Sequence, residues 1–148
     1  MRVLHVIPAF QPAVWYGGPV FSVSGLCQGL LRHGADVRVL TTDSAGPHAR
    51  LPVQTDKEVE WEAIPVRYCR RVYPESISFS LLAALPGAMS WADVVHLTGI
   101  YNFPTFPCLA WGRMTGKPVV WSPRGALLRW EGSRKTGAKA IWDRAANL

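Results

Sequence analysis

Largely apolar runs alternate along this chain with longer stretches that carry apolar residues at helical spacing. Residues 3–7 predict a buried strand, and residues 19–33 place their apolar side chains on one helical face. The same patterns predict strands at residues 37–41, 59–64, 66–69, 93–98 and 118–122, and helices at 77–89, 103–114 and 136–147. This order predicts an α/β fold, a Rossmann-like parallel sheet with helices on both faces.

Glycine and proline mark the expected boundaries. Gly34 and Gly116 follow helical stretches, where a left-handed residue commonly ends a helix. Pro65 predicts a break between two strands, and Pro86 predicts a kink or an end in the helix that contains it. Residues 42–57 are polar and rich in Ala, Gly and Pro, so we expect a surface loop.

A ligand site is expected beyond the carboxyl ends of the strands, as in other open α/β sheets. Four loops converge there, at residues 9–18, 42–44, 98–103 and 122–125. In the first of them, Gly17 and Gly18 precede Pro19 at a predicted helix start, which favours backbone N–H groups that face a phosphate or another anion. Tight-turn geometry is the alternative. The GxGxxG and GxxxxGK[ST] patterns are absent from the chain, which disfavours nicotinamide and P-loop sites.

Length, hydrophobic content and charge limit the number of domains, the location and the partners that we expect. With 148 residues, 49% of them hydrophobic, the chain predicts one domain, and its start is a poor signal peptide, so we expect a cytoplasmic protein. The net charge of +6 comes wholly from residues 113–148, which favours an anionic partner unless this region is only a solvated helical face. Within it, Trp130, Lys135, Lys139 and Trp142 predict contact with the inner face of a membrane or with a further domain.

Cysteine usage and two charge-poor stretches exclude other classes. Cys27, Cys69 and Cys108 are odd in number and widely spaced, so we expect reduced, buried side chains rather than disulfides or a metal site. Prolines and polar residues interrupt the charge-poor residues 76–92 and 94–111, so neither stretch predicts a membrane span.

Four segments in register resemble the amino-terminal domain of a family 4 glycosyltransferase with the GT-B fold. The segments are RVLHVIP at residues 2–8, YGGPVFSVSGLCQGLLRHGADVRVLTT at 16–42, ADVVHLTGIYNFPT at 92–105, and GKPVVWSPRGAL at 116–127. The resemblance implies that residues 1–148 are the acceptor-side Rossmann-like domain of a longer enzyme, whose carboxyl-terminal donor domain lies outside this chain. The ExxxxxxxE signature of that second domain does not occur here.

The resemblance also implies an activity. Family members transfer a sugar from a nucleotide-sugar donor to a glycan, a lipid-linked acceptor or a small acceptor, with retention of anomeric configuration. They need no metal and no cofactor, because the nucleotide sugar, UDP- or GDP-linked, is a substrate. We therefore expect a role in polysaccharide biosynthesis for the full-length protein, and an inactive isolated fragment.

The family pattern assigns roles to several residues of this chain. Gly17 and Gly18 match the glycine pair that contacts the donor diphosphate. The resemblance places an acceptor pocket along the carboxyl-end loops, lined by Trp15, Tyr16, Thr98, Gly99, Tyr101, Asn102 and Arg124. Aromatic faces stack on sugar rings, although both aromatic residues are also suited to covering the core.

His96 and Arg124 are the weak catalytic candidates. The Arg124 guanidinium suits a diphosphate or acceptor oxygens, or else a nearby carboxylate that fixes the loop; Gly125 permits the close turn there. His96 lies within a predicted strand, where core packing is the alternative, and Thr98 stands where many relatives have a second histidine. Asp43, after the second strand, is expected to cap its loop.

Three other functions share some of these features. A non-catalytic nucleotide- or sugar-binding Rossmann-like module would show every one of them, and only a second domain distinguishes it from an enzyme. A nicotinamide-dependent enzyme with Asp43 as ribose ligand is disfavoured by the glycine spacing. A nucleic-acid module is disfavoured because the basic region lacks a recognition motif.

Overall fold

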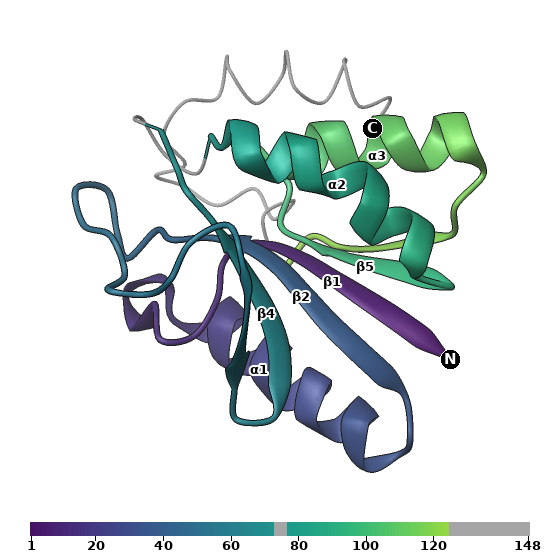
Figure 1. Cartoon of the computed structure of the whole chain (residues 1–148), viewed down its shortest axis with the longest axis horizontal. Coiled ribbons are helices and arrows are strands. Elements are labelled where there is room, and N and C mark those ends of the chain that lie inside the picture. Colours follow the sequence, from purple (N-terminus) through teal and green to yellow (C-terminus); the bar gives the residue numbers. More distant parts are fainter. Residues whose placement is uncertain (73–76, 125–148) are drawn as a thin grey trace, which may run out of the picture.

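The computed structural model describes residues 1–72 and 77–124, which form a six-stranded sheet with helices on both faces (Figure 1). Its elements are β1 (Arg2–Ala9), the 3₁₀ turn η1 (Val14–Tyr16), α1 (Gly18–Arg32), β2 (Asp36–Thr42), β3 (Glu58–Trp61), β4 (Ile64–Cys69), α2 (Phe79–Trp91), β5 (Val94–Thr98), α3 (Thr105–Thr115) and β6 (Val119–Ser122). The predicted helix at 136–147 and the residues Gly125, Trp130, Lys135, Lys139 and Trp142 lie outside the described residues.

The strand order is β3-β4-β2-β1-β5-β6, and every neighbouring pair is parallel except β3 with β4. β1 lies centrally, and its His5 pairs in register with Val39 of β2 and with His96 of β5. The carboxyl ends of the parallel strands therefore meet at one edge of the sheet. The predicted Rossmann-like α/β fold is confirmed.

Two apolar layers hold the fold together. α1 packs on one face of the sheet through Val23 and Cys27, against side chains that include Val3 and Ile7 of β1. α2 and α3 cover the other face, where Leu4 of β1 and the neighbouring strands pack against them (Figure 1). Because β1 is buried on both faces, nearly all of its residues are apolar.

The break expected at Pro65 is wrong, and of the two outcomes expected at Pro86, a kink or an end, the end is wrong. Pro65 lies inside β4, because the β4–β2 ladder begins only at Val66 and so needs no amide donor from Pro65. The hairpin turn falls instead at Glu62 and Ala63, both with positive φ, a conformation that matches strand twist. α2 does not end at Pro86 but continues to Trp91. Pro86 has no N–H to donate to the carbonyl of Leu82, four residues earlier, and Leu82 is partly exposed to water.

The glycine predictions are confirmed. Gly34 and Gly116 both have positive φ, and each follows the last turn of a helix.

The segment from 43 to 57 contains only one isolated bridge, between Ser44 and Arg50. Part of it is buried, because Asp43 and Ser44 lie inside the protein rather than on the surface that the sequence predicts.

Candidate functional site

A pocket of about 260 Å³ lies at the carboxyl ends of β1 and β5 and beside the loop that follows β6. Among its lining residues are six that the sequence predicted for the acceptor pocket: Tyr16, Thr98, Gly99, Tyr101, Asn102 and Arg124. Three of the four loops expected to converge therefore do line one cavity. The fourth, at 42–44, contributes no lining residue, but its Ser44 contacts the lining residue Tyr16.

Thr98 is the buried polar residue of this pocket. Its side chain is only 2% exposed, and its hydroxyl has no hydrogen-bond partner among residues 1–72 and 77–124. That hydroxyl oxygen has almost no surface open to the pocket, so Thr98 lines the cavity without presenting its hydroxyl to a ligand. Polar contacts with a ligand must therefore come from other lining residues, among them Asn102 and Arg124.

The turn at 99–102 forms one wall of the pocket. Gly99 has φ +93°, and a Cβ at this position would collide with the Asn102 side chain. Its carbonyl accepts a hydrogen bond from Trp121 Nε1 at 2.7 Å, and its N–H donates to Ser122 O at 3.0 Å. Thr105 Oγ1 lies 2.9 Å from Asn102 Oδ1, which fixes the amide next to the pocket. Glycine is thus required here for backbone geometry.

The glycine pair opens α1 beside the pocket but does not line it. Gly17 donates its N–H to Val14 O at 3.0 Å, so the expectation that both glycine amides are available is wrong for Gly17. Gly18 is exposed, and its N–H has no acceptor within the described part of the chain. Pro19 has no N–H, and Val20 donates to Gly17 O at 3.1 Å. The anion-binding capacity of this turn therefore rests on the Gly18 amide.

The two aromatic residues of the first loop have different surroundings. Tyr16 lines the pocket and its hydroxyl lies 2.7 Å from Ser44 Oγ, the closest support from the β2 loop. Trp15 is 70% exposed, packs beside Gly46 and is not a lining residue.

Arg71 supports this arrangement, and the sequence analysis missed it. Its side chain is only 4% exposed and donates to Ser44 Oγ at 3.0 Å, Gly46 O at 2.9 Å and Ala49 O at 2.8 Å. Asp43 accepts from the Arg71 backbone N–H at 2.8 Å, which confirms its expected capping role. The Arg70–Arg71 pair follows a strand in the sequence, but no local pattern distinguishes a buried guanidinium from an exposed one.

A chain of hydrogen bonds crosses three strands just below the pocket. His5 Nδ1 and His96 Nδ1 are 2.9 Å apart, and His96 Nε2 lies 2.7 Å from Ser122 Oγ. The two rings meet edge to face, with centroids 4.8 Å apart. His5 is the second residue that the sequence analysis missed. The signal was a histidine in the middle of two apolar runs that pair in register.

Both imidazoles are held neutral. Burial, then the nearby His96 and Arg124, lowers the pKa of His5 to about 3. Burial followed by the Arg124 charge lowers the pKa of His96. His5 Nε2 has no partner among the described residues. An unpaired buried acceptor is commoner than an unpaired N–H. His5 therefore donates to His96, and His96 donates to Ser122.

Arg124 lies at the rim of the pocket, on the loop after β6. Its φ of +54° is uncommon for a residue with a side chain, and such strain is concentrated at functional sites. The guanidinium is exposed and acts electrostatically on both histidines. This position suits a cation that binds an anionic group at the pocket entrance.

Two further features are absent from residues 1–72 and 77–124. No three His, Cys, Asp or Glu side chains gather there in a way that would hold a metal ion. None of the helices found there is long and apolar enough to cross a membrane.

Comparison with known proteins adds one finding. The model of a family described as glycosyl transferase 4-like domain matches residues 17–147. This match covers most of the chain, from the glycine turn at the start of α1 onward. No curated protein shows a significant match.

Proposed function

The chain belongs to the glycosyl transferase 4-like family, and we propose that it forms the acceptor side of a retaining glycosyltransferase. In the proposed reaction, the bond between the anomeric carbon of the donor and a diphosphate oxygen breaks. A new bond forms from that carbon to an acceptor hydroxyl oxygen, and the hydroxyl proton leaves with the released diphosphate. The donor is a nucleotide sugar linked to UDP or GDP, and the acceptor is a glycan, a lipid-linked sugar or a small molecule.

The pocket at the carboxyl ends of β1 and β5, with Arg124 at its rim, carries this proposal. The neighbouring Asn102 amide and the Tyr16 and Tyr101 side chains supply further polar and aromatic contacts. We assign to Trp15 the parts of the acceptor that extend beyond the pocket.

The proposed contacts with the diphosphate come from the rim. The Gly18 N–H opens α1, where the helix dipole favours an anion, and Arg124 lies on the facing loop. These two groups account for part of a donor site only. We therefore propose that a carboxyl-terminal donor domain completes the site and that the present chain alone does not turn over.

Location is part of the same proposal. We place the enzyme in the cytoplasm, with the basic residues after position 112 in peripheral contact with the inner membrane face or with the donor domain. The alternative is a non-catalytic module that binds a nucleotide or a sugar. The absence of Asp, Glu and His from the described lining of the pocket favours that alternative for the chain on its own.

The proposal is tested by adding UDP-glucose and GDP-mannose to the 148-residue chain and following backbone amide resonances. We expect saturable shifts at Gly18, Gly99 and Arg124, and no sugar transfer. Arg124→Gln should lower the affinity measured from these shifts about tenfold, because the substitution removes a charge-assisted hydrogen bond.

The matched control is Arg113→Gln, an exposed arginine in the last turn of α3 that does not line the pocket. Shifts confined to other faces of the sheet, or equal affinities for the two variants, would refute the assignment of the rim. Robust turnover by the chain alone would refute the need for a second domain.

A further inference from the structure

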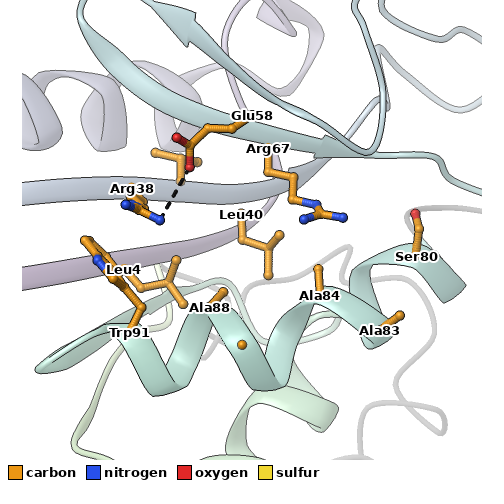
Figure 2. Close-up of a pocket in the computed structure, with 12 residues that line it drawn as sticks. Leu4, Arg38, Leu40, Glu58, Arg67, Ser80, Ala83, Ala84, Ala88 and Trp91 are labelled. Atoms are coloured by element: carbon orange, nitrogen blue, oxygen red, sulfur yellow. Dashed lines mark ion pairs between the residues drawn. The ribbon is translucent and has the colours of Figure 1, made fainter.

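A second cavity lies on the opposite side of the sheet from α1, between the strands and α2. It is an open groove of about 450 Å³ and shares no lining residue with the candidate site. Its floor is formed by the buried side chains of Leu4 and Leu40 (Figure 2). Along α2 the wall consists of small residues, with Ala84 and Ala88 facing the strands (Figure 2). The middle of the groove is therefore apolar, with small side chains along its α2 wall.

The charges at one end of the groove compensate each other. Arg38 Nη1 lies 3.7 Å from a carboxylate oxygen of Glu58, and its guanidinium carbon lies 4.3 Å from the centroid of the Trp91 ring (Figure 2). The ion pair and the aromatic face both stabilise the Arg38 cation. This end of the groove therefore carries little net charge.

Arg67 carries an uncompensated charge at the other end. Its side chain extends from β4 into the groove, toward the side of Ser80 in the first turn of α2 (Figure 2). Among the residues that the structure describes, no carboxylate lies within 4.0 Å of the Arg67 nitrogens. Glu58 is its cross-strand partner in the ladder, but the ion pair of Glu58 is with Arg38.

The other titratable groups near Arg67 do not neutralise it. Burial raises the pKa of the Cys69 thiol to about 11, so the adjacent sulfur stays uncharged at neutral pH. The Asp56 carboxylate is near enough to act electrostatically on the Cys69 thiol, but it forms no ion pair with Arg67 and accepts a hydrogen bond at 3.3 Å from the Arg70 backbone N–H. The groove thus joins an apolar middle to a single cationic end with a hydroxyl beside it.

We propose that this groove binds a single-chain anionic amphiphile. Its phosphate or carboxylate head pairs with Arg67 and Ser80, and its hydrocarbon chain lies over Leu40 and Leu4 along the small-residue side of α2. The distance from Ser80 to Trp91 along the helix is about 16 Å, which favours a linear ligand. A free anion would leave the apolar floor in water, whereas a neutral lipid would leave Arg67 without an anionic partner. This site is independent of the proposed transferase function.

The test measures binding of dodecyl phosphate to the 148-residue chain by calorimetry, at concentrations below micelle formation. We expect saturable 1:1 binding that Arg67→Gln weakens about tenfold or more, because a charge-assisted hydrogen bond is lost. Gly87→Leu should abolish binding: Gly87 lines the groove, and a Cβ there meets no atom within 4 Å, so the larger side chain extends into the open space.

Leucine favours helix more than glycine, so Gly87→Leu keeps the fold, which circular dichroism checks. Gly25→Leu is the matched control, because Gly25 is an exposed glycine of α1 whose Cβ would also meet nothing within 4 Å. This control variant should bind dodecyl phosphate as the unmodified chain does.

Three further probes distinguish the head from the chain. Dodecanoate in place of dodecyl phosphate tests whether the groove accepts a carboxylate head, and binding of either anion supports the proposal. Dodecyl maltoside, which has no charge, and inorganic phosphate, which has no chain, should each bind at least tenfold more weakly. Equal binding of either one, no binding of both anionic amphiphiles, or equal effects of Gly87→Leu and Gly25→Leu would overturn it.

Discussion

Acidification should destabilise this protein through His5. Burial lowers the pKa of the His5 imidazole from its ordinary 6.5 to about 3 in the folded chain. The unfolded chain therefore takes up the proton first as the pH falls. The stability that the neutral His5 ring contributes is fully present above about pH 6.5 and is lost progressively as the pH falls to about 3. Between pH 7 and pH 5 this single linkage removes about 2 kcal/mol of unfolding free energy.

The assay is urea denaturation followed by tryptophan fluorescence at pH 7 and pH 5. His5→Asn removes the titrating ring but keeps a polar group near the position of Nδ1, which contacts His96. We expect the variant to lose about 2 kcal/mol less than the unmodified chain between these two pH values. His96, whose pKa is lowered in the same direction, retains its own smaller dependence.

The control for this experiment is His33→Asn, which removes an exposed imidazole at the end of α1. It should change the difference between pH 7 and pH 5 less than His5→Asn does, because this imidazole is exposed to water. If His5→Asn and His33→Asn alter the pH dependence equally, then His5 is not buried as a neutral group. The hydrogen-bonded chain described above would be wrong.

Two other predictions follow from buried groups. Arg71→Met should lower the free energy of unfolding by about 2–4 kcal/mol, because Ser44, Gly46 and Ala49 lose a buried donor. Urea denaturation measures this change. A loss no larger than that of the exposed control Arg113→Met would contradict the prediction. Cys27, Cys69 and Cys108 are buried, and their thiol pKa values are raised to about 12, 11 and 12. Ellman's reagent at pH 8 should therefore react with these thiols only after unfolding. Rapid reaction of any thiol in the folded protein would contradict its burial.

Much of the fold could be predicted because the central strands are buried on both faces. Such strands are apolar over most of their length, as β1 is apart from Arg2 and His5 and β5 apart from His96 and Thr98. This pattern can be recognised without knowledge of the neighbouring strands. The convergence of the loops follows from the parallel order of the strands. The pocket therefore contains Thr98 and Asn102, as the sequence predicts.

The remaining features depend on contacts between distant segments. Arg71 is buried only because the loop after β2 turns its carbonyls toward it, and no local pattern encodes that loop. The Gly17 amide is taken up by the 3₁₀ turn before it, which the composition of residues 9–18 does not reveal. Pro65 is tolerated because β4 extends beyond the start of its ladder with β2, a register that the sequence alone does not fix.

The antiparallel hairpin at one side of the sheet limits self-association. β3 is an outermost strand of only four residues, and it carries Glu58 and Glu60 on one face. A short, charged strand is a poor template for a strand from another molecule, because an incoming chain would gain few hydrogen bonds and bring its backbone close to two carboxylates. Fibril growth from this margin is thereby disfavoured, even though the sheet behind it is rich in valine and leucine.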